Sequence, residues 1–133
     1  MSQENVEVFD RALEAFNRRD AASFAVLCAD DVEIVPLRAA LEATVYRGPN
    51  AVATFFAALV EDWTDLGAVE IEAIHDGDDW VLGTGRYRAR GRSSGVPVET
   101  RLSMVMRFRD GLATSLRTYA EPADALETVG LRE

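Results

Sequence analysis

Four segments in the second half of the chain alternate between apolar and polar residues, and short turns separate them. The segments are 68–74, 80–91, 97–109 and 112–120. A period of two residues is typical of strands that bury one face. Asp76-Gly77 and Asp110-Gly111 are dipeptides that favour tight hairpins. This half of the chain therefore predicts antiparallel strands joined by short turns.

The first half of the chain is mainly helical in pattern. Apolar residues recur at helical spacing, and Asp20 is a good cap for a second, short helix whose buried side carries Phe24 and Cys28. The expected elements are a helix over 3–18, the short helix after Asp20, a strand over 32–37, a loop over 38–48, a helix over 48–63 and a last short helix over 122–130. Helices first and strands last predict one α+β domain over 1–133, with helices covering one face of a curved antiparallel sheet.

The composition excludes several classes of function. The formal net charge of −9 disfavours binding of nucleic acid or of an anionic membrane surface. All fourteen cations are arginine, so lysine chemistry such as Schiff-base formation is excluded. The single cysteine, Cys28, fits a reducing compartment. The start MSQENVEVF lacks the pattern of a signal peptide and no apolar stretch is long enough to cross a bilayer, so we expect a cytoplasmic protein.

Five segments of the sequence carry a resemblance to a known family. They are AFNRRD (15–20), CADDVEIVPL (28–37), VYRGPNAVATFF (45–56), MRFRDGLATSLRTY (106–119) and PADALETVGL (122–131). In this order and spacing they resemble the SnoaL-like branch of the nuclear transport factor 2-like superfamily. The resemblance implies a cone, in which a bent sheet wraps around a pocket, and a homodimer through the outer face of the sheet. It fixes no activity, because the superfamily hosts several kinds of enzyme.

In such a cone, the apolar side of residues 101–108 faces the pocket and the arginine side faces outward, where Arg–Glu pairs between neighbouring strands are expected. Gly83 and Gly85 fall on the inward side. They either widen the cavity or accommodate a bulge and strong curvature. By inward parity and family position, the expected pocket lining is Phe16, Ile34, Tyr46, Phe55, Leu59, Trp63, Tyr87, Leu102, Met104, Met106, Leu116 and Thr118, with Phe24 and Leu27 beside them.

The groups that catalytic relatives use are missing at the matching positions. In the pattern of the steroid isomerases, Ala12 stands for the tyrosine, Pro36 at or next to the base, and Met104 for the neutral acid. Thr118 stands where the epoxide hydrolases place an aspartate. Neither mechanism is therefore expected of this chain.

The remaining candidates for an acid or base are Arg38, Glu42 and the only histidine, His75, which is expected in a turn at the pocket rim. We expect no cofactor and no metal, because Cys28 and His75 have no ligand spacing and the aspartates at 76–79 lack the length of a calcium loop.

The sequence thus favours a pocket for a small hydrophobic or aromatic molecule, with no reaction assigned. Two alternatives stay open. One is an enzyme of the polyketide-cyclase, isomerase or hydrolase type that uses an acid or base at the pocket rim. The other is a dimeric structural domain whose cone is filled by its own side chains.

Overall fold

The computed structural model describes residues 2–36, 45–66, 69–91 and 96–130. The helices in this part of the chain are α1 (Ser2–Asn17), α2 (Ala21–Ala25), α4 (Ala51–Asp62) and α5 (Pro122–Thr128). The strands are β1 (Cys28–Val35), β2 (Tyr46–Arg47), β3 (Trp63–Leu66), β4 (Glu70–Asp76), β5 (Trp80–Gly91), β6 (Pro97–Arg109) and β7 (Leu112–Tyr119). None of the helices described has the length and apolar character needed to span a membrane.

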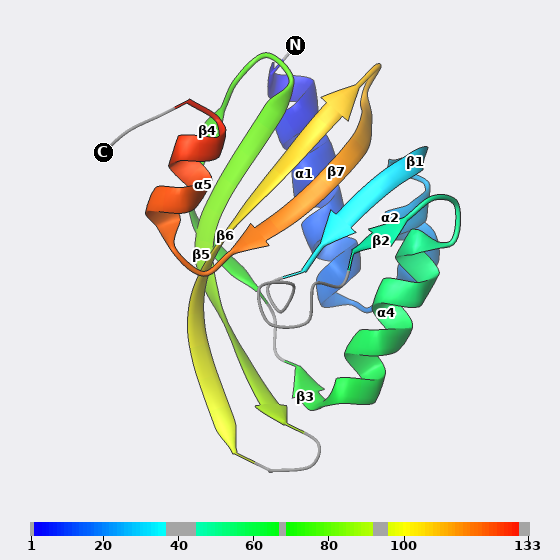
Figure 1. The fold of residues 1–133 in the computed structure, drawn as a ribbon, viewed down its shortest axis with the longest axis vertical. Coiled ribbons are helices and arrows are strands. Elements are labelled where there is room, and N and C mark those ends of the chain that lie inside the picture. Colours follow the sequence, from blue (N-terminus) through cyan, green and yellow to red (C-terminus); the bar gives the residue numbers. More distant parts are fainter. Residues whose placement is uncertain (1, 37–44, 67–68, 92–95, 131–133) are drawn as a thin grey trace.

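The strands form one bent sheet in the order β2-β1-β7-β6-β5-β3, and β4 also pairs with β5 (Figure 1). The hairpins β4–β5, β5–β6 and β6–β7 are antiparallel, as predicted. The expectation of a purely antiparallel sheet is wrong at one place, because β1 and β7 run parallel. Parallel neighbours need a long connection between them, and here most of the chain separates β1 from β7.

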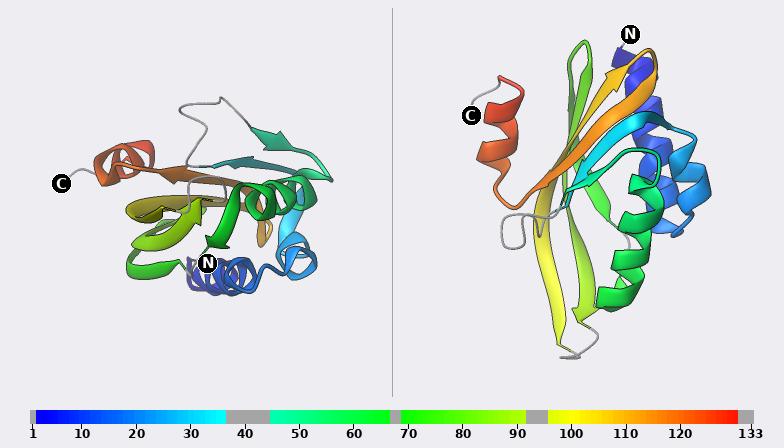
Figure 2. Two further views of the ribbon diagram at one scale, coloured as in Figure 1. Left: turned by 90° about the horizontal axis from the view of Figure 1, so that it is seen from below. Right: turned by 45° about the vertical axis from the view of Figure 1, so that its right-hand side comes forward.

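Helices lie on both sides of this sheet. Helices α1, α2 and α4 lie on one side, which we call the inner face, and α5 lies on the other, which we call the outer face (Figure 2). The contacts agree with this view, since α1 packs on β5, α4 packs on β1, β2 and β3, and α5 packs on β5, β6 and β7. The α+β prediction is therefore confirmed, but the outer face is not bare.

Helix α2 begins where the sequence predicts it. The Asp20 carboxylate accepts a hydrogen bond from the backbone N–H of Ser23 at 3.1 Å, and a second from the Ser23 hydroxyl at 2.6 Å. The first of these bonds satisfies a backbone donor that the first turn of a helix leaves open, and both bonds lower the pKa of Asp20.

Strand β6 buries side chains on both of its faces. Its inner side chains, Leu102, Met104, Met106 and Phe108, belong to the large hydrophobic core, as predicted. On the outer face, Ser103 and Val105 are also buried, at 0 % and 2 % exposure. Val105 forms a second, smaller core with Leu82 and Ala125 beneath α5. The arginine side of β6 therefore faces outward, as predicted, and helix α5 covers the part of it around Val105.

Beyond α5, the outer face carries the expected pairs of arginine and glutamate on neighbouring strands. They are Arg86–Glu99 at 3.5 Å, Arg88–Glu99 at 3.2 Å and Arg86–Glu70 at 3.9 Å. A further pair, Arg101–Glu72 at 3.2 Å, joins β6 to β4 across the intervening β5. All of these side chains are at least partly exposed, so each pair contributes only about 0–1 kcal/mol.

The two inward glycines of β5 permit close packing. A Cβ atom at Gly83 would lie 2.7 Å from the tip of the Phe9 ring on α1. A Cβ atom at Gly85 would collide with the backbone carbonyl of Glu70 on β4, next to the irregularity in the β4–β5 register. Of the two explanations left open by the sequence, the accommodation of close packing and a bulge is the one that these contacts support.

We predict that Gly83→Ala lowers the free energy of unfolding by about 1–3 kcal/mol, because the new methyl group overpacks against Phe9. Urea denaturation measures this loss. The matched control is the same substitution in a Phe9→Leu background, which removes the ring tip and should make the cost smaller. An equal loss of unfolding free energy in the two backgrounds would show that the Phe9 ring of α1 does not pack against Gly83.

We also predict that Met104→Asp lowers the free energy of unfolding by about 2–5 kcal/mol, because it buries a carboxyl group among apolar side chains. Met104→Leu, which keeps the site apolar, should cost less than about 1.5 kcal/mol. Thermal unfolding followed by circular dichroism compares the two variants. An unchanged melting temperature in Met104→Asp would mean that this side of β6 faces water.

Candidate ligand-binding site

The inner face of the sheet is built around a cluster of five aromatic rings. Phe16 comes from α1, Phe24 from α2, Phe55 and Phe56 from α4, and Tyr46 from β2. The ring centroids of Phe16 and Phe55 lie 6.2 Å apart in a stacked arrangement, and those of Tyr46 and Phe55 lie 5.7 Å apart. Phe56 meets the rings of Phe16, Phe24 and Phe55 edge to face. Each such pair adds about 0.5–1.5 kcal/mol beyond the area it buries.

Most of the predicted pocket lining gathers in this region. The members buried in the same core are Phe16, Phe24, Ile34, Phe55, Leu102, Met104, Met106 and Leu116. Leu27, Tyr46 and Tyr87 are half-buried and pack against that core. Thr118 is half-buried and lies in register with Met104. The side chains of Leu59 and Trp63 lie outside the described part of the structure.

The hydrophobic residues of the inner core include three that carry a titratable group. They are Tyr46, Tyr87 and Cys28, which are half-buried and pack against that core. Burial raises the pKa of the Cys28 thiol to about 11, so it is protonated at neutral pH. Its Sγ donates a hydrogen bond to the carbonyl of Phe24 at 3.5 Å. The hydrophobic residues of this wall can therefore bury an apolar ring, and none of them is a carboxylate or a histidine.

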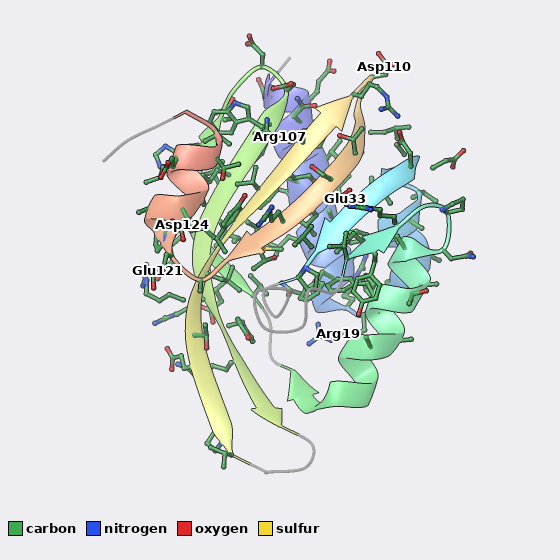
Figure 3. The ribbon with its side chains drawn as sticks, in the orientation of Figure 1. Arg19, Glu33, Arg107, Asp110, Glu121 and Asp124 are labelled. Atoms are coloured by element: carbon green, nitrogen blue, oxygen red, sulfur yellow. The ribbon has the colours of Figure 1, made fainter. Side chains whose placement is uncertain are left out.

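Arg19, at the end of α1, is a feature of this site that the sequence analysis did not identify (Figure 3). Its backbone is left-handed, with φ at 58°, and its guanidinium lies 5.3 Å from the centroid of the Phe16 ring. The guanidinium donates hydrogen bonds to the carbonyls of Phe16 at 2.7 Å and Asn17 at 3.2 Å. Burial lowers the pKa of Arg19. The signal in the sequence was a cation directly after a helix, where it can bind the last carbonyl groups.

The described structure does not bring together the residues that were candidates for an acid or base at the pocket rim. His75 lies within β4 rather than in the turn, is exposed, and pairs in register with Leu82, whose side chain packs beneath α5 on the outer face. Arg38 and Glu42 lie outside the described residues. Within the described ranges, no group of three histidine, cysteine or acidic side chains is arranged to hold a metal ion.

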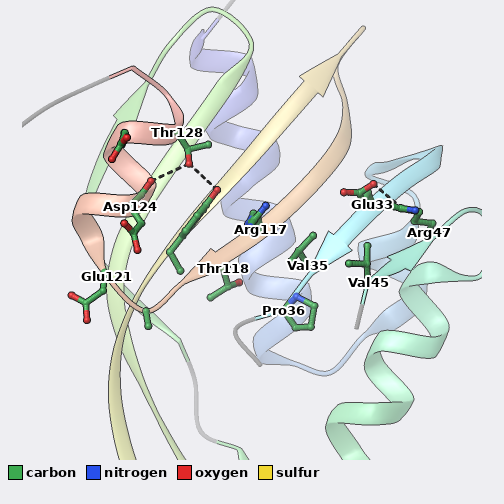
Figure 4. A pocket seen from close by; sticks show the side chains of 13 residues that line it. Glu33, Val35, Pro36, Val45, Arg47, Arg117, Thr118, Glu121, Asp124 and Thr128 are labelled. Carbon is green, nitrogen blue, oxygen red and sulfur yellow. Dashed lines mark hydrogen bonds and ion pairs between the residues drawn. The ribbon is translucent and has the colours of Figure 1, made fainter. Parts of the chain in front are cut away.

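A separate groove of about 900 Å³ opens on the outer face (Figure 4). Strand β7 forms its floor, α5 forms one wall, and β1 and β2 form the other. Its lining residues are Glu33, Val35, Pro36, Val45, Arg47, Arg117, Thr118, Tyr119, Ala120, Glu121, Asp124, Glu127 and Thr128. Thr118 is the only predicted pocket residue among them. The groove depends on where α5 docks, which no local pattern in the sequence reveals.

Solved structures with the same fold cover nearly the whole chain. A protein of unknown function described as NTF2-like, from Burkholderia pseudomallei, has a TM-score of 0.79 and 18% identity over 98% of this chain and 99% of its own. An NTF2-like protein from Burkholderia thailandensis has a TM-score of 0.77 and 23% identity over 97% and 98% of the two chains. A candidate polyketide cyclase from Xanthomonas campestris pv. campestris has a TM-score of 0.77 and 16% identity over 97% and 98%.

At these identities the structures show the shared fold alone. A search of curated proteins finds no match. The SnoaL-like domain family, in contrast, matches residues 9–116. The match spans most of the chain, from the middle of α1 to the middle of β7, and confirms the resemblance seen in the sequence. The chain belongs to the SnoaL-like domain family.

Proposed function

We propose that the protein binds a small hydrophobic or aromatic molecule between the inner face of the sheet and the helices α1 and α4. The observation that carries the proposal is the chemistry of the inner wall, whose hydrophobic core is made of aromatic rings, aliphatic side chains and methionines. Such a wall stabilises an apolar ring by excluding water from it. In this proposal residues 1–133 act as one domain.

The proposed ligand lies between Met104 and Met106 of β6 on one side and the rings of Phe16 and Phe55 on the other. Methionine side chains are flexible and polarisable, and they adapt to aromatic ligands of different shapes. Tyr46 is half-buried and its ring lies beside that of Phe55, so in this proposal its hydroxyl orients a ligand that carries an oxygen atom. Arg19 adds a positive charge near the Phe16 ring.

The second candidate function is an enzyme that acts on such a molecule. It is favoured by one observation, the similarity in fold to a protein described as a candidate polyketide cyclase. Because the hydrophobic residues of the inner wall supply no carboxylate and no histidine, this alternative needs a group from the pocket rim, such as Arg38 or Glu42. The first candidate needs only the apolar wall.

We further propose that the protein forms a homodimer through the outer face of the sheet, as the family resemblance implies. A single cysteine that has no internal partner suits a reducing compartment, and we place the dimer in the cytoplasm. The net charge of −9 makes nucleic acid and anionic membranes unfavourable partners.

Native mass spectrometry of the purified protein, sprayed from a non-denaturing volatile buffer, tests the ligand proposal. We predict an adduct of a hydrophobic molecule that is lost on unfolding in organic solvent. Met104→Trp should abolish the adduct, because the indole occupies the proposed ligand volume. The matched control is Val45→Trp, which adds the same ring at an exposed residue of the outer groove and should keep the adduct.

The same variants separate a hollow cone from a filled one. In a filled cone, Met104→Trp overpacks the core and costs about 1–3 kcal/mol or more, and no adduct is found in the parent protein. That pair of results would contradict the proposal. A stable Met104→Trp variant without adduct, from a parent protein with adduct, would support it.

A further inference from the structure

We propose that the second copy in the homodimer docks on the groove between α5 and β2, with Arg117 of each copy facing the α5 carboxylates of the other. This inference rests on the proposed dimer and names the part of the outer face that forms it. It follows from three features of the groove: unpaired charge of both signs, the placement of those charges on different surfaces, and the firm docking of α5.

The cation without an ion pair is Arg117. It projects from the outer side of β7 and is exposed, and its guanidinium lies 5.2 Å from the centroid of the Tyr119 ring. In the described part of the chain it has no carboxylate within ion-pair distance. Arg47, the other cation of the groove, is already engaged with Glu33 at 2.9 Å. Arg117 is therefore the positive charge that the groove leaves open to a partner.

The carboxylates without ion pairs are on α5. Glu121, Asp124 and Glu127 line the groove and are exposed, and none of them forms an ion pair with a described residue. Figure 3 shows Glu121 and Asp124 on one side of β7 and Glu33 on the other. The groove thus presents an acidic wall on α5 and an open cation on its floor.

Helix α5 holds its carboxylates in a fixed place on the sheet. Its Ala125 is completely buried against Leu82 and Val105. The hydroxyls of Tyr119 and Thr128 lie 3.0 Å apart in a hydrogen bond, and Arg107 donates to the carbonyl of Thr128 at 3.2 Å. A wall anchored in this way can meet a partner without the entropy cost of ordering a loop.

A second copy supplies both missing charges at once. In a two-fold symmetric contact, each pairing between one copy and the other occurs twice. Arg117 of one copy then meets the α5 wall of its partner, and the reverse pairing follows by symmetry. Because each copy carries a net charge of −9, the long-range field opposes association, so local pairs of opposite charge must select the contact. Val35, Pro36 and Val45 add apolar surface to the same groove.

Charge exchange tests this interface in the full-length protein. Arg117→Glu alone and the double variant Asp124→Lys/Glu127→Lys alone should each place like charges opposite one another. We expect each to raise the dimer dissociation constant about tenfold or more in analytical ultracentrifugation. An equimolar mixture of the two should restore dimers, because every pairing in the mixed species joins opposite charges. Circular dichroism spectra matching the parent protein confirm that both variants fold.

Arg101→Glu is the matched control, since it makes the same change in charge on the outer face but outside the groove. It should leave the dissociation constant unchanged. A parent protein that is monomeric at high concentration overturns both the dimer and this interface.

A dimer that survives Arg117→Glu, or a mixture that fails to restore dimers, overturns the interface while the dimer stands. Binding of a basic peptide by a parent protein that does not self-associate would overturn both the dimer and the interface, and would show that the groove serves another partner. None of these outcomes bears on the ligand proposal, because the hydrophobic adduct is measured separately by native mass spectrometry.

Discussion

The burial of strand β6 on both of its faces is the constraint on which the rest of the structure depends. Its inner side chains enter the core shared with α1, α2 and α4. On the outer face, Val105 packs against Ala125 of α5, and Ser103 is buried and hydrogen-bonded to Thr84 of β5. A one-residue slip of this strand would exchange the two sets, and would place Arg101 and Arg107 among the aromatic rings. The register with β5 and β7 therefore fixes which chemistry each face presents: apolar on the inner face, charged and grooved on the outer face.

Close packing against β5 connects that constraint to the proposed ligand site. Gly83 lets the Phe9 ring approach the sheet, and Gly85 lets the backbone of β4 do the same. Helix α1 is thereby seated so that Phe16 reaches the rings of Phe55 and Phe56 on α4. The inner wall is apolar because its members come from the buried stripes of three helices and the inward positions of the strands. A ligand that binds there must gain most of its affinity from the removal of apolar surface from water.

Long, regular elements could be predicted from the sequence, and short or non-local features could not. The strand over 97–109, its hairpins and the Asp20 cap are found where the sequence places them, because strand alternation and capping are local signals. Strands β2 and β3 have only two and four residues, too few to show a period. The parallel pairing of β1 with β7 and the groove beside α5 arise from contacts between distant segments. The inward parity of Met104 and Met106 was correctly predicted, whereas the role of Arg19 depends on a left-handed backbone that no periodicity encodes.

The central claim is that the inner face encloses an apolar volume large enough for a small molecule. A crystal structure determined under xenon pressure tests it most directly, because xenon enters dry apolar cavities and is readily located. The account predicts xenon bound between Met104 on β6 and the rings of Phe16 and Phe55. An inner face filled continuously by side chains, with xenon absent from it or bound only in the outer groove, would contradict the account.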